Sequence, residues 1–318
     1  TPSALSEGIF WDFSKQQISE AVMQYFGFDK SIIPDIRPVF SEHGHLMKSI
    51  ADELSLKEGI PVCYKAGDQP NNALSLNVMR PGEVAATAGT SGVIYGVSDK
   101  LTYDPQSRVN SFAHVNHEQD LTRVGVLLCI NGTGILNKWI KNLTGNLSYP
   151  EMNELAGTVK PGSEGLQVLP FGNGVERMLN NKLVGAHLQH IDLNKHQSAH
   201  LVRASQEGIA FAFRYGLDIM RSNGMQPQFI RAGKANMFLS KVFCEAFVNA
   251  TNVPVELYNC DGSVGAALGA GIGCGYFNQA SEAFDKRQMI DFIEASHADL
   301  YDELYMKWKE TLEKQLAS

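Results

Sequence analysis

One carboxylate stands where the chain could perform chemistry. The segment Cys63–Ser75, CYKAGDQPNNALS, contains a single acid, Asp68, directly after a glycine and close to the end of an apolar stretch. An aspartate at such a point can form a turn with its own backbone, or it can act as a positioned general base. Gln69, Asn71 and Asn72 follow it and offer amide groups to a ligand rich in hydroxyls. These residues by themselves leave both roles open.

Three glycine-containing turns are candidates for phosphate binding. They read GTSG at 89–92, NGTG at 131–134 and AGKAN at 232–236. Small residues in a turn expose backbone N–H groups that attract anions, although each turn can also be ordinary turn chemistry. The third turn lies between an expected strand and an expected helix, where α/β proteins usually bind ligands. None of the three matches a P-loop or a clean dinucleotide-binding motif.

Other catalytic signals are weaker. The histidine pairs His43/His45 and His187/His190 have no clear third partner, so no metal site is predicted. No G-x-S-x-G nucleophile motif occurs. Arg177 could meet a substrate, but a structural salt bridge is the preferred interpretation. The five cysteines include no C-x-x-C pair, which indicates a reducing compartment.

Composition restricts the class of protein. The 318 residues are 44% hydrophobic and 19% charged, as in globular proteins, and the formal net charge of -7 argues against nucleic-acid binding. Residues 262–281 carry no charge but are rich in glycine and alanine. We therefore expect a buried helix there rather than a membrane span. No signal peptide is recognisable, and the sequence begins with Thr1.

Strands and helices alternate along the chain, which predicts the α/β class. Helices are expected over 14–26, 45–56 and 135–145, and near the C-terminus around Leu300, Leu304, Trp308 and Leu312. A strand is expected over 60–67, a hairpin joins strands at 83–89 and 92–98, and a buried strand at 123–130 leads into a glycine turn. Residues 227–257 read as strand, glycine turn, helix and strand.

A long helix is expected to begin near Asn194, with Asn194 as its N-cap and Gln197 at the third helical position. Gly224 suits the residue just after its end. One face carries apolar or small side chains at helical spacing, at Leu201, Ser205, Gly208, Ala212, Gly216 and Ile219. Small residues on this stripe predict that a neighbouring element packs very closely.

Four motifs in a fixed order identify a resemblance. AGDQPNNAL, TAGTSGVIYGVSD, FIRAGKANMFLSKVF and DGSVGAALGAGIGCGYF follow one another, and SEGIFWDFSKQQISEAVMQYFGFDKSIIPDI precedes them. Together they resemble the C-terminal part of the FGGY family of carbohydrate kinases, with the xylulose kinases as the nearest branch. The resemblance covers nearly the whole chain. It implies ribonuclease-H-like domains of the actin/hexokinase ATPase type, with ATP and sugar bound in the cleft between two domains.

The resemblance also implies roles for single residues. Asp68 matches the family's general base, which takes the proton of a sugar hydroxyl as its oxygen attacks the γ-phosphate, and Gln69 matches a sugar contact. A positioned base contributes about 10²–10⁴-fold in rate. Lys234 stands where many members have glycine, so it could lie along the nucleotide or point to solvent. The implied nucleotide contacts are Gly89, Thr90 and Ser91 for phosphates, Gly132 and Asn137 near the nucleotide, and Ala232, Gly233 and Asn236 for adenosine.

The same resemblance implies a domain division. Residues 1–76 would be the C-terminal remnant of the first, sugar-binding domain, and residues 77–318 the second, nucleotide-binding domain. The Asp-x-Gly-Thr phosphate loop of the first domain is not found, so we expect the chain alone to be inactive. Magnesium would be held mainly through ATP phosphates and residues outside this chain, with no metal ligand within it.

The expected function is ATP-dependent phosphorylation of D-xylulose to D-xylulose 5-phosphate. A kinase for glycerol, L-ribulose or gluconate is one alternative, and a non-catalytic actin-like nucleotide-binding module is another. Retention of Asp68 argues against the module, because a nucleotide switch needs no base directed at a polyol. The expected partners are a sugar and ATP, without nucleic acid or membrane, and the expected compartment is the cytoplasm. A homodimer is compatible with the sequence, which does not determine the oligomeric state.

Overall fold

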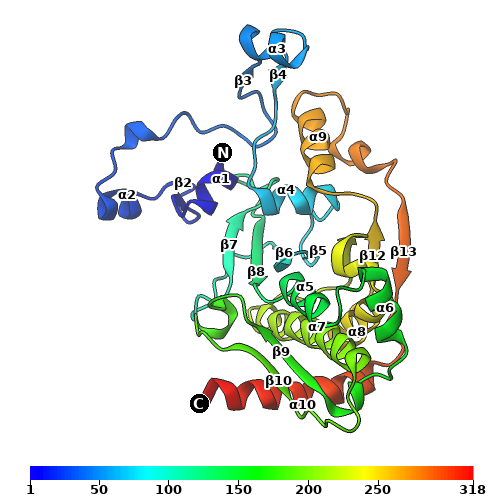
Figure 1. Cartoon of the computed structure of the whole chain (residues 1–318). Helices are drawn as coiled ribbons and strands as arrows, with labels where there is room; N and C mark the ends of the chain where they lie inside the picture. The colour runs from blue at the N-terminus through cyan, green and yellow to red at the C-terminus, as the bar shows by residue number, and fades with distance from the viewer. Residues whose placement is uncertain (318) are drawn as a thin grey trace.

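The centre of the molecule is a seven-stranded mixed sheet, seen in a computed structural model that describes residues 1–317. The strand order is β13-β12-β11-β5-β6-β8-β7 (Figure 1). Strands β5, β11 and β12 run parallel, and the remaining pairs are antiparallel. The strands are β5 (Val84–Ala88), β6 (Gly92–Ser98), β7 (Asn110–Ala113), β8 (Val124–Ile130), β11 (Ile230–Gly233), β12 (Val255–Tyr258) and β13 (Met289–Ile293). The predicted α/β class is confirmed.

The predicted hairpin forms the middle of this sheet. Strand β5 pairs with β6 in the register Ala88↔Gly92, so the Gly-Thr-Ser turn at 89–91 joins them. Both strands are almost entirely buried. Short runs of small and β-branched residues on either side of a glycine turn therefore form the predicted hairpin, and the structure adds that its strands are mostly buried.

Helix α7 (Ser198–Ser222) runs through the core, and its small residues permit close packing as predicted. A β-carbon on Gly208 would lie 2.2 Å from the carbonyl oxygen of Val168, in β9 (Gln167–Phe171). A β-carbon on Gly216 would lie 2.5 Å from the side chain of Leu128 in β8. Only glycine allows the helix to approach both strands this closely.

The predicted start of α7 is wrong by about one turn. The N-cap is Gln197, whose side chain accepts from the third helical N–H, while the His200 imidazole accepts from the Gln197 N–H at 3.2 Å. Asn194 instead belongs to the preceding turn, where its N–H donates to Asp192 Oδ1. The C-terminal expectation is confirmed, because Gly224 has a φ of 93° just after the C-cap residue.

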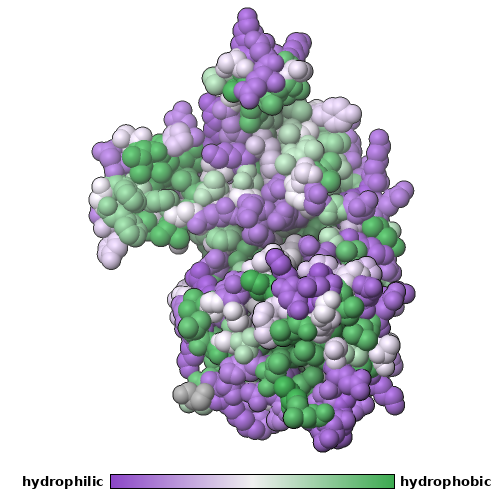
Figure 2. Space-filling model, viewed as in Figure 1, coloured by the Kyte–Doolittle hydropathy of each residue, from purple (hydrophilic) through white to green (hydrophobic). Residues whose placement is uncertain are grey.

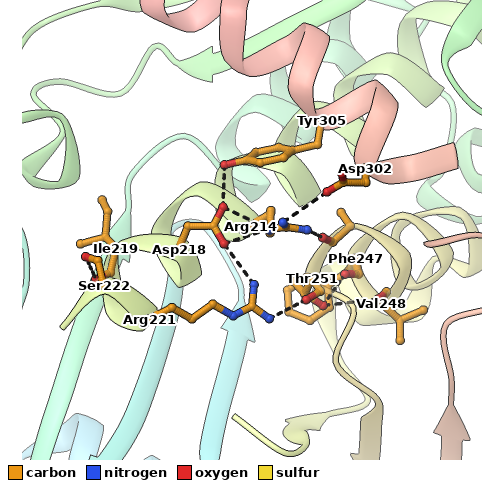
Figure 3. A network of polar contacts seen from close by, with 11 residues as sticks. Arg214, Asp218, Ile219, Arg221, Ser222, Phe247, Val248, Thr251, Asp302 and Tyr305 are labelled. Atoms are coloured by element: carbon orange, nitrogen blue, oxygen red, sulfur yellow. Dashed lines mark hydrogen bonds and ion pairs between the residues drawn. The ribbon is translucent and has the colours of Figure 1, made fainter. Parts of the chain in front are cut away.

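Two further helices pack on α7, namely α8 (Lys241–Thr251) and α10 (Ala298–Ala317). Figure 3 shows Asp218 of α7 at the centre of a polar network between them. Its carboxylate accepts from Arg214 Nε at 2.9 Å, Arg221 Nη1 at 3.0 Å and the Tyr305 hydroxyl at 3.0 Å. Arg221 also donates to the Thr251 carbonyl of α8. These bonds join the three helices at their edge.

The apolar face of α10 differs in part from the prediction. Trp308 and Leu312 are buried as expected, but Leu300 is 43% exposed. Tyr305 and Tyr301 take the buried positions one and two turns before Trp308, against Phe211 of α7. The shift arises because tyrosine can bury its ring while its hydroxyl reaches a polar partner.

The remaining elements after residue 76 include two helices and a separate two-stranded ribbon. Helices α5 (Gly134–Leu143) and α6 (Tyr149–Gly157) follow β8, and β9 pairs with β10 (Gly185–Gln189) as a separate antiparallel ribbon. Trp308 Nε1 donates to Val168 O in β9 at 2.8 Å, which ties α10 to this ribbon.

The first 76 residues form small elements that extend from the main sheet (Figure 1). They comprise α1 (Pro2–Glu7), β1 (Trp11–Asp12), β2 (Gln17–Ile18), α2 (Glu20–Phe26), β3 (Gly44–His45), α3 (Lys48–Leu54), β4 (Pro61–Val62) and α4 (Asp68–Ser75). The predicted helix at 14–26 begins only at Glu20, because Ser19 caps it and β2 pairs with β1 before it. The predicted helix at 45–56 begins at Lys48, and the strand at 60–67 is reduced to β4. The domain boundary at residue 76 stays a prediction.

The segment around α2 exposes many apolar side chains. Figure 2 shows a hydrophobic area at this position, at the left of the molecule. The exposed residues there include Tyr25, Phe26, Phe28 and Ile32. Apolar surface of this extent commonly marks an interaction site.

Helix α9 (Gly262–Gly273) is closely packed, but only on its glycine face. A β-carbon on Gly265 would lie 2.5 Å from Asn71 O, one on Gly269 would lie 2.7 Å from the Tyr64 ring, and one on Gly273 would overlap the Cys63 carbonyl. The other face, with Val264, is exposed, so the expectation of a buried helix is wrong. Across residues 1–317, no helix combines the length and hydrophobicity that a bilayer crossing requires.

Candidate functional site

A cleft of about 940 Å³ opens between the end of β5, helices α5 and α6, and the start of α8. Four of the residues predicted from the turns contribute to its wall, namely Gly89, Thr90, Asn137 and Asn236. Residues that are more than 140 positions apart along the chain therefore meet at one site. A space of this size accommodates a ligand as large as a nucleotide.

The turn at 89–91 has its carbonyl groups tied back and its N–H groups free. Gly134 N donates to Gly89 O at 2.9 Å, and Ile135 N donates to Thr90 O at 3.1 Å. The N–H groups of Thr90 and Ser91 have no acceptor within residues 1–317. Because the electronegative carbonyls are occupied and the donors are not, the turn suits an anion such as phosphate.

Gly134 makes this arrangement sterically possible. A β-carbon at this position would lie 2.4 Å from the carbonyl oxygen of Gly89, closer than any normal contact. Sequence reasoning selected Gly132 in the same turn and missed Gly134. The motif NGTG contains both glycines, but only the tertiary packing shows which of them touches the turn of residues 89–91, called the phosphate-type turn below.

Two asparagines present polar groups to the cleft. Asn137 on α5 is 6% exposed, and its Oδ1 is buried without a hydrogen-bond partner. A buried acceptor without a partner costs about 1–3 kcal/mol, which a ligand donor would recover. Asn236 has a φ of 53°, a left-handed conformation that asparagine tolerates better than most residues. Its Nδ2 lies next to Gly89, 3.7 Å from the position of a β-carbon there.

Gln206 of α7 holds two residues that line the cleft, Asn153 and Ser240. Its Nε2 donates to Asn153 Oδ1 of α6 at 3.0 Å, and its Oε1 accepts from Ser240 Oγ at 2.7 Å. Ser240 also caps α8 by accepting from Phe243 N. The side chain of Gln206 is fully buried, so this amide fixes two wall residues relative to each other. The sequence alone had not indicated a role for Gln206, Asn153 or Ser240.

Lysine side chains from two helices also line the cleft. Lys138 of α5 and Lys241 of α8 face it together with one carboxylate, Glu154 of α6. Their sum is one positive charge, which favours a phosphorylated ligand. Tyr149 lies one turn before Asn153 on the same face of α6, and this helical spacing was the sequence signal that could have identified the α6 wall.

Several predicted contacts lie behind the wall of this cleft. A β-carbon on Gly132 would overlap the Pro170 carbonyl, so this glycine serves packing against β9. Ala232 is buried in β11 opposite Ala86. Gly233 approaches the Cys260 carbonyl, and Lys234 pairs with Asp291 at 3.7 Å instead of entering the cleft. The nucleotide roles of Gly132, Ala232 and Gly233 stay predictions.

Asp68 is the first residue of α4, with Gly67 as N-cap. Its side chain is exposed, and Gln69 Nε2 donates to Asp68 Oδ2 at 3.2 Å. A carboxylate in the first helical turn is favoured by the helix dipole. Both interpretations of the residue therefore remain compatible with its position, since a local structural role does not exclude a role as a base.

Asp68 does not line the cleft, but its helix α4 contacts the start of α9, the segment that follows β12. Asn71 Nδ2 of α4 donates to Gly262 O at 2.8 Å, and Gly262 is the first residue of α9, four positions after the end of β12. Because β5, β11 and β12 are parallel, their carboxyl ends share one edge of the sheet. This edge is where open α/β sheets bind ligands.

A second carboxylate lies beside this acid. The Glu7 carboxylate covers Gly67 so closely that a β-carbon there would lie 1.9 Å from Glu7 Oε1. That oxygen is buried without a hydrogen-bond partner. Burial raises the pKa of Glu7, and the negative charge of Asp68 raises it further.

The remaining sequence candidates have structural partners. His43 and His187 lie against the carbonyls of Val39 and Val184, and within residues 1–317 no three His, Cys, Asp or Glu side chains gather as metal ligands. The Arg177 Nε donates to Ser107 O at 2.6 Å. Its partner is thus a carbonyl group, where a salt bridge was expected.

Comparison with known proteins identifies the relatives of the chain. A xylulose kinase of Lactococcus lactis is 26% identical over 94% of this chain and 60% of its own length. A xylulose kinase of Rhodospirillum rubrum has the same fold, with a TM-score of 0.86 at 24% identity, over all of this chain and 65% of that one. A glycerol kinase of Plasmodium falciparum, solved with ADP, has a TM-score of 0.86 at 18% identity, over 97% of this chain and 61% of that one. The chain therefore spans about three fifths of the length of these relatives.

The fold shared with these kinases is the actin/hexokinase type of ATPase fold, as the resemblance implied. The model of the C-terminal domain of the FGGY family of carbohydrate kinases matches residues 84–275. This match begins at β5, takes in the whole cleft and ends just after α9. The chain belongs to the FGGY family of carbohydrate kinases.

Proposed function

We propose that this chain supplies the ATP-binding wall and the general base of a kinase that phosphorylates a sugar hydroxyl, converting D-xylulose to D-xylulose 5-phosphate. The observation that carries the proposal is the cleft at the carboxyl edge of the sheet. It combines a turn with free N–H groups, two lysines and a buried acceptor without a partner. A glycerol kinase solved with ADP shares this fold, which supports a nucleotide as the occupant.

The phosphates would bind at the turn of residues 89–91. The N–H groups of Thr90 and Ser91 would donate to phosphate oxygens, and Lys138 would neutralise part of their charge. The adenosine end would lie toward Asn236 and Asn137. The Oδ1 atom of Asn137 has no partner and would accept from a donor on the ligand. Magnesium, held mainly through the ATP phosphates, would supply positive charge that neutralises part of theirs.

Asp68 would accept the proton of the sugar hydroxyl as its oxygen attacks the γ-phosphate. It is exposed at the start of α4, which contacts the segment after β12, and the proposal requires a bound ligand to extend from the turn of residues 89–91 to this carboxylate. Gln69, which donates to Asp68, would orient the carboxylate and contact the sugar hydroxyls. Most of the remaining acceleration would come from alignment and charge neutralisation.

A substrate panel tests the reaction. ADP release is measured with D-xylulose, glycerol, L-ribulose and gluconate, for the protein as isolated from its source and for the 318-residue chain. D-xylulose is expected to give the highest kcat/KM in the isolated protein, whereas the chain alone is expected to turn over none. A clear preference for another of the four substrates would reject the assignment of the sugar, and turnover by the chain would reject the expectation of inactivity.

Replacement of the base tests the mechanism separately. Asp68→Asn is expected to reduce turnover by about 10²–10⁴-fold while the affinity for ADP stays within a factor of about two. Asp120→Asn, in an exposed loop, serves as the matched control and should behave as wild type. Full activity of Asp68→Asn would show that this carboxylate is not the base.

A further inference from the structure

A buried carboxylate holds the second glycine turn from below. Glu176 is 0% exposed and lies just before the short helical turn Arg177–Leu179. Its Oε1 accepts from Asn131 N at 3.0 Å and from Gly132 N at 3.2 Å, and its Oε2 accepts from Asn131 N at 3.1 Å. One acid therefore binds two consecutive backbone N–H groups 45 and 44 positions earlier in the chain.

Further hydrogen bonds join the same two segments. We call the bonds from residues 173–176 to Asn131 and Gly132 the clamp. Asn131 Nδ2 donates to Val175 O at 2.8 Å, and Asn173 Nδ2 donates to Asn131 O at 3.2 Å. Both polar groups of the Asn131 peptide and its side chain are thus held by residues 173–176. This segment lines no part of the cleft described above.

The turn of residues 131–134 is itself hydrogen-bonded to the turn of residues 89–91. Gly134 N and Ile135 N, directly after the clamped residues, donate to the carbonyls of Gly89 and Thr90. Those two bonds occupy the carbonyls of Gly89 and Thr90, whereas the N–H groups of Thr90 and Ser91 have no acceptor within residues 1–317. A displacement of the 131–134 turn would therefore change the geometry of the proposed phosphate site without altering any residue that touches it.

We propose that Glu176 is a positioning residue for nucleotide binding. Its ionised carboxylate clamps the turn of residues 131–134, and protonation of that carboxylate loosens the turn and lowers the affinity for the nucleotide. This inference rests on the proposed function of the cleft. Glu176 acts through backbone groups and does not touch the ligand.

The surroundings of Glu176 allow its charge to change near neutrality. Burial raises the pKa of Glu176 to about 7, and the two backbone N–H bonds offset only part of that rise. On β8, Cys129 is its titratable neighbour, and the pKa of that thiol is raised by burial and then by the Glu176 charge. On its own segment, Arg177 Nε donates to Ser107 O and Lys182 Nζ donates to Leu316 O, so neither cation pairs with the carboxylate.

The sign of the effect follows from linkage. Above about pH 7 the carboxylate is ionised and accepts both N–H groups, whereas below that pH it is protonated and accepts them less strongly. A ligand that requires the clamped turn binds the ionised form more tightly, so binding releases a proton. Affinity for the nucleotide should therefore increase as the pH rises through 7.

The test compares Glu176→Gln with wild type in calorimetric titrations with magnesium-saturated ADP at pH 6, 7 and 8. Glutamine keeps the shape but offers one acceptor oxygen and an NH₂ group that cannot accept. The ratio of the variant Kd to the wild-type Kd is expected to be about two at pH 6 and to reach about ten at pH 8. Glu303→Gln, exposed on α10, is the control and should keep a ratio of one throughout. A ratio that stays the same from pH 6 to pH 8 would overturn the inference.

Two measurements keep the test independent of other assumptions. Amide hydrogen exchange in the absence of nucleotide should be faster at residues 131 and 132 in Glu176→Gln, and unchanged protection there would refute the clamp even if wild type binds no ADP. Failure of wild type to bind ADP would reject the proposed function alone. If the variant does not fold, proton release is counted for wild type at pH 7 in buffers of different ionisation heat. About half a proton per ADP is expected, and no release would overturn the inference.

Discussion

Gly134→Ala is the substitution that most directly tests how the phosphate-type turn is held. The added β-carbon would lie 2.4 Å from Gly89 O, whereas ordinary contacts begin at 3.4 Å. The two turns must therefore separate by about 1 Å, because both partners are backbone and neither can rotate away. This movement strains the bonds from Gly134 N and Ile135 N to the 89–90 carbonyls.

The magnitude follows from those two hydrogen bonds. Each contributes about 0.5–1.5 kcal/mol, so their loss amounts to about 1–3 kcal/mol. If about half of this free energy appears in ligand binding, the affinity for ADP falls by about two- to tenfold. The rest appears as a lower melting temperature, by several degrees for a domain of this size.

Calorimetric titration with ADP measures the loss of affinity, and thermal unfolding measures the loss of stability. Gly157→Ala is the matched stability control, because a β-carbon there meets no atom within 4 Å and alanine favours the helix. It should raise the melting temperature slightly, whereas Gly134→Ala lowers it. Wild-type affinity together with a wild-type melting temperature in Gly134→Ala would refute the proposed contact between the two turns.

Three further substitutions test the frame around the cleft. Gln206→Leu leaves Asn153 Oδ1 and Ser240 Oγ without their buried partner, and should lower the free energy of unfolding by about 1–3 kcal/mol in urea titrations and weaken ADP binding. An unchanged stability would contradict the role of this amide. Gly208→Ala forces α7 away from Val168 O and should cost about 1–3 kcal/mol without changing the ligand contacts; a neutral result would contradict the close packing. For Glu176, the folded pKa of about 7 exceeds the ordinary 4.5, so folding favours the protonated form and wild-type stability falls between pH 5 and pH 7. Glu176→Gln should lack this decrease in denaturant titrations, and an equal slope in both proteins would contradict it.

Local patterns in the sequence predicted many of the elements between residues 83 and 257. The hairpin at 83–98, the buried strand before NGTG and the strand-turn-helix-strand unit at 227–257 all form as expected. Their signals are short apolar runs, glycine turns and helical spacing, which depend on neighbours along the chain. The N-terminal 76 residues were predicted less well, because their short elements pair with each other and not with the main sheet.

The order of four motifs also led from the sequence to the FGGY family, and the family match at residues 84–275 confirms it. The sequence thus determined the class of fold and the type of turns that reach the cleft. It also drew attention to Asp68, whose role as a base stays a proposal. What each turn contacts was not available from these signals.

Only the tertiary structure decided which residues face the ligand and which support them. Gly132 and Gly134 belong to one motif, yet the first packs on β9 and the second holds the Gly89 turn. Lys234 turns to Asp291, and Glu176 clamps backbone 45 residues away. The physical reason is that such contacts are set by how a helix or strand packs across the sheet. Residue type and local spacing determine the element, but the partner comes from a distant part of the chain.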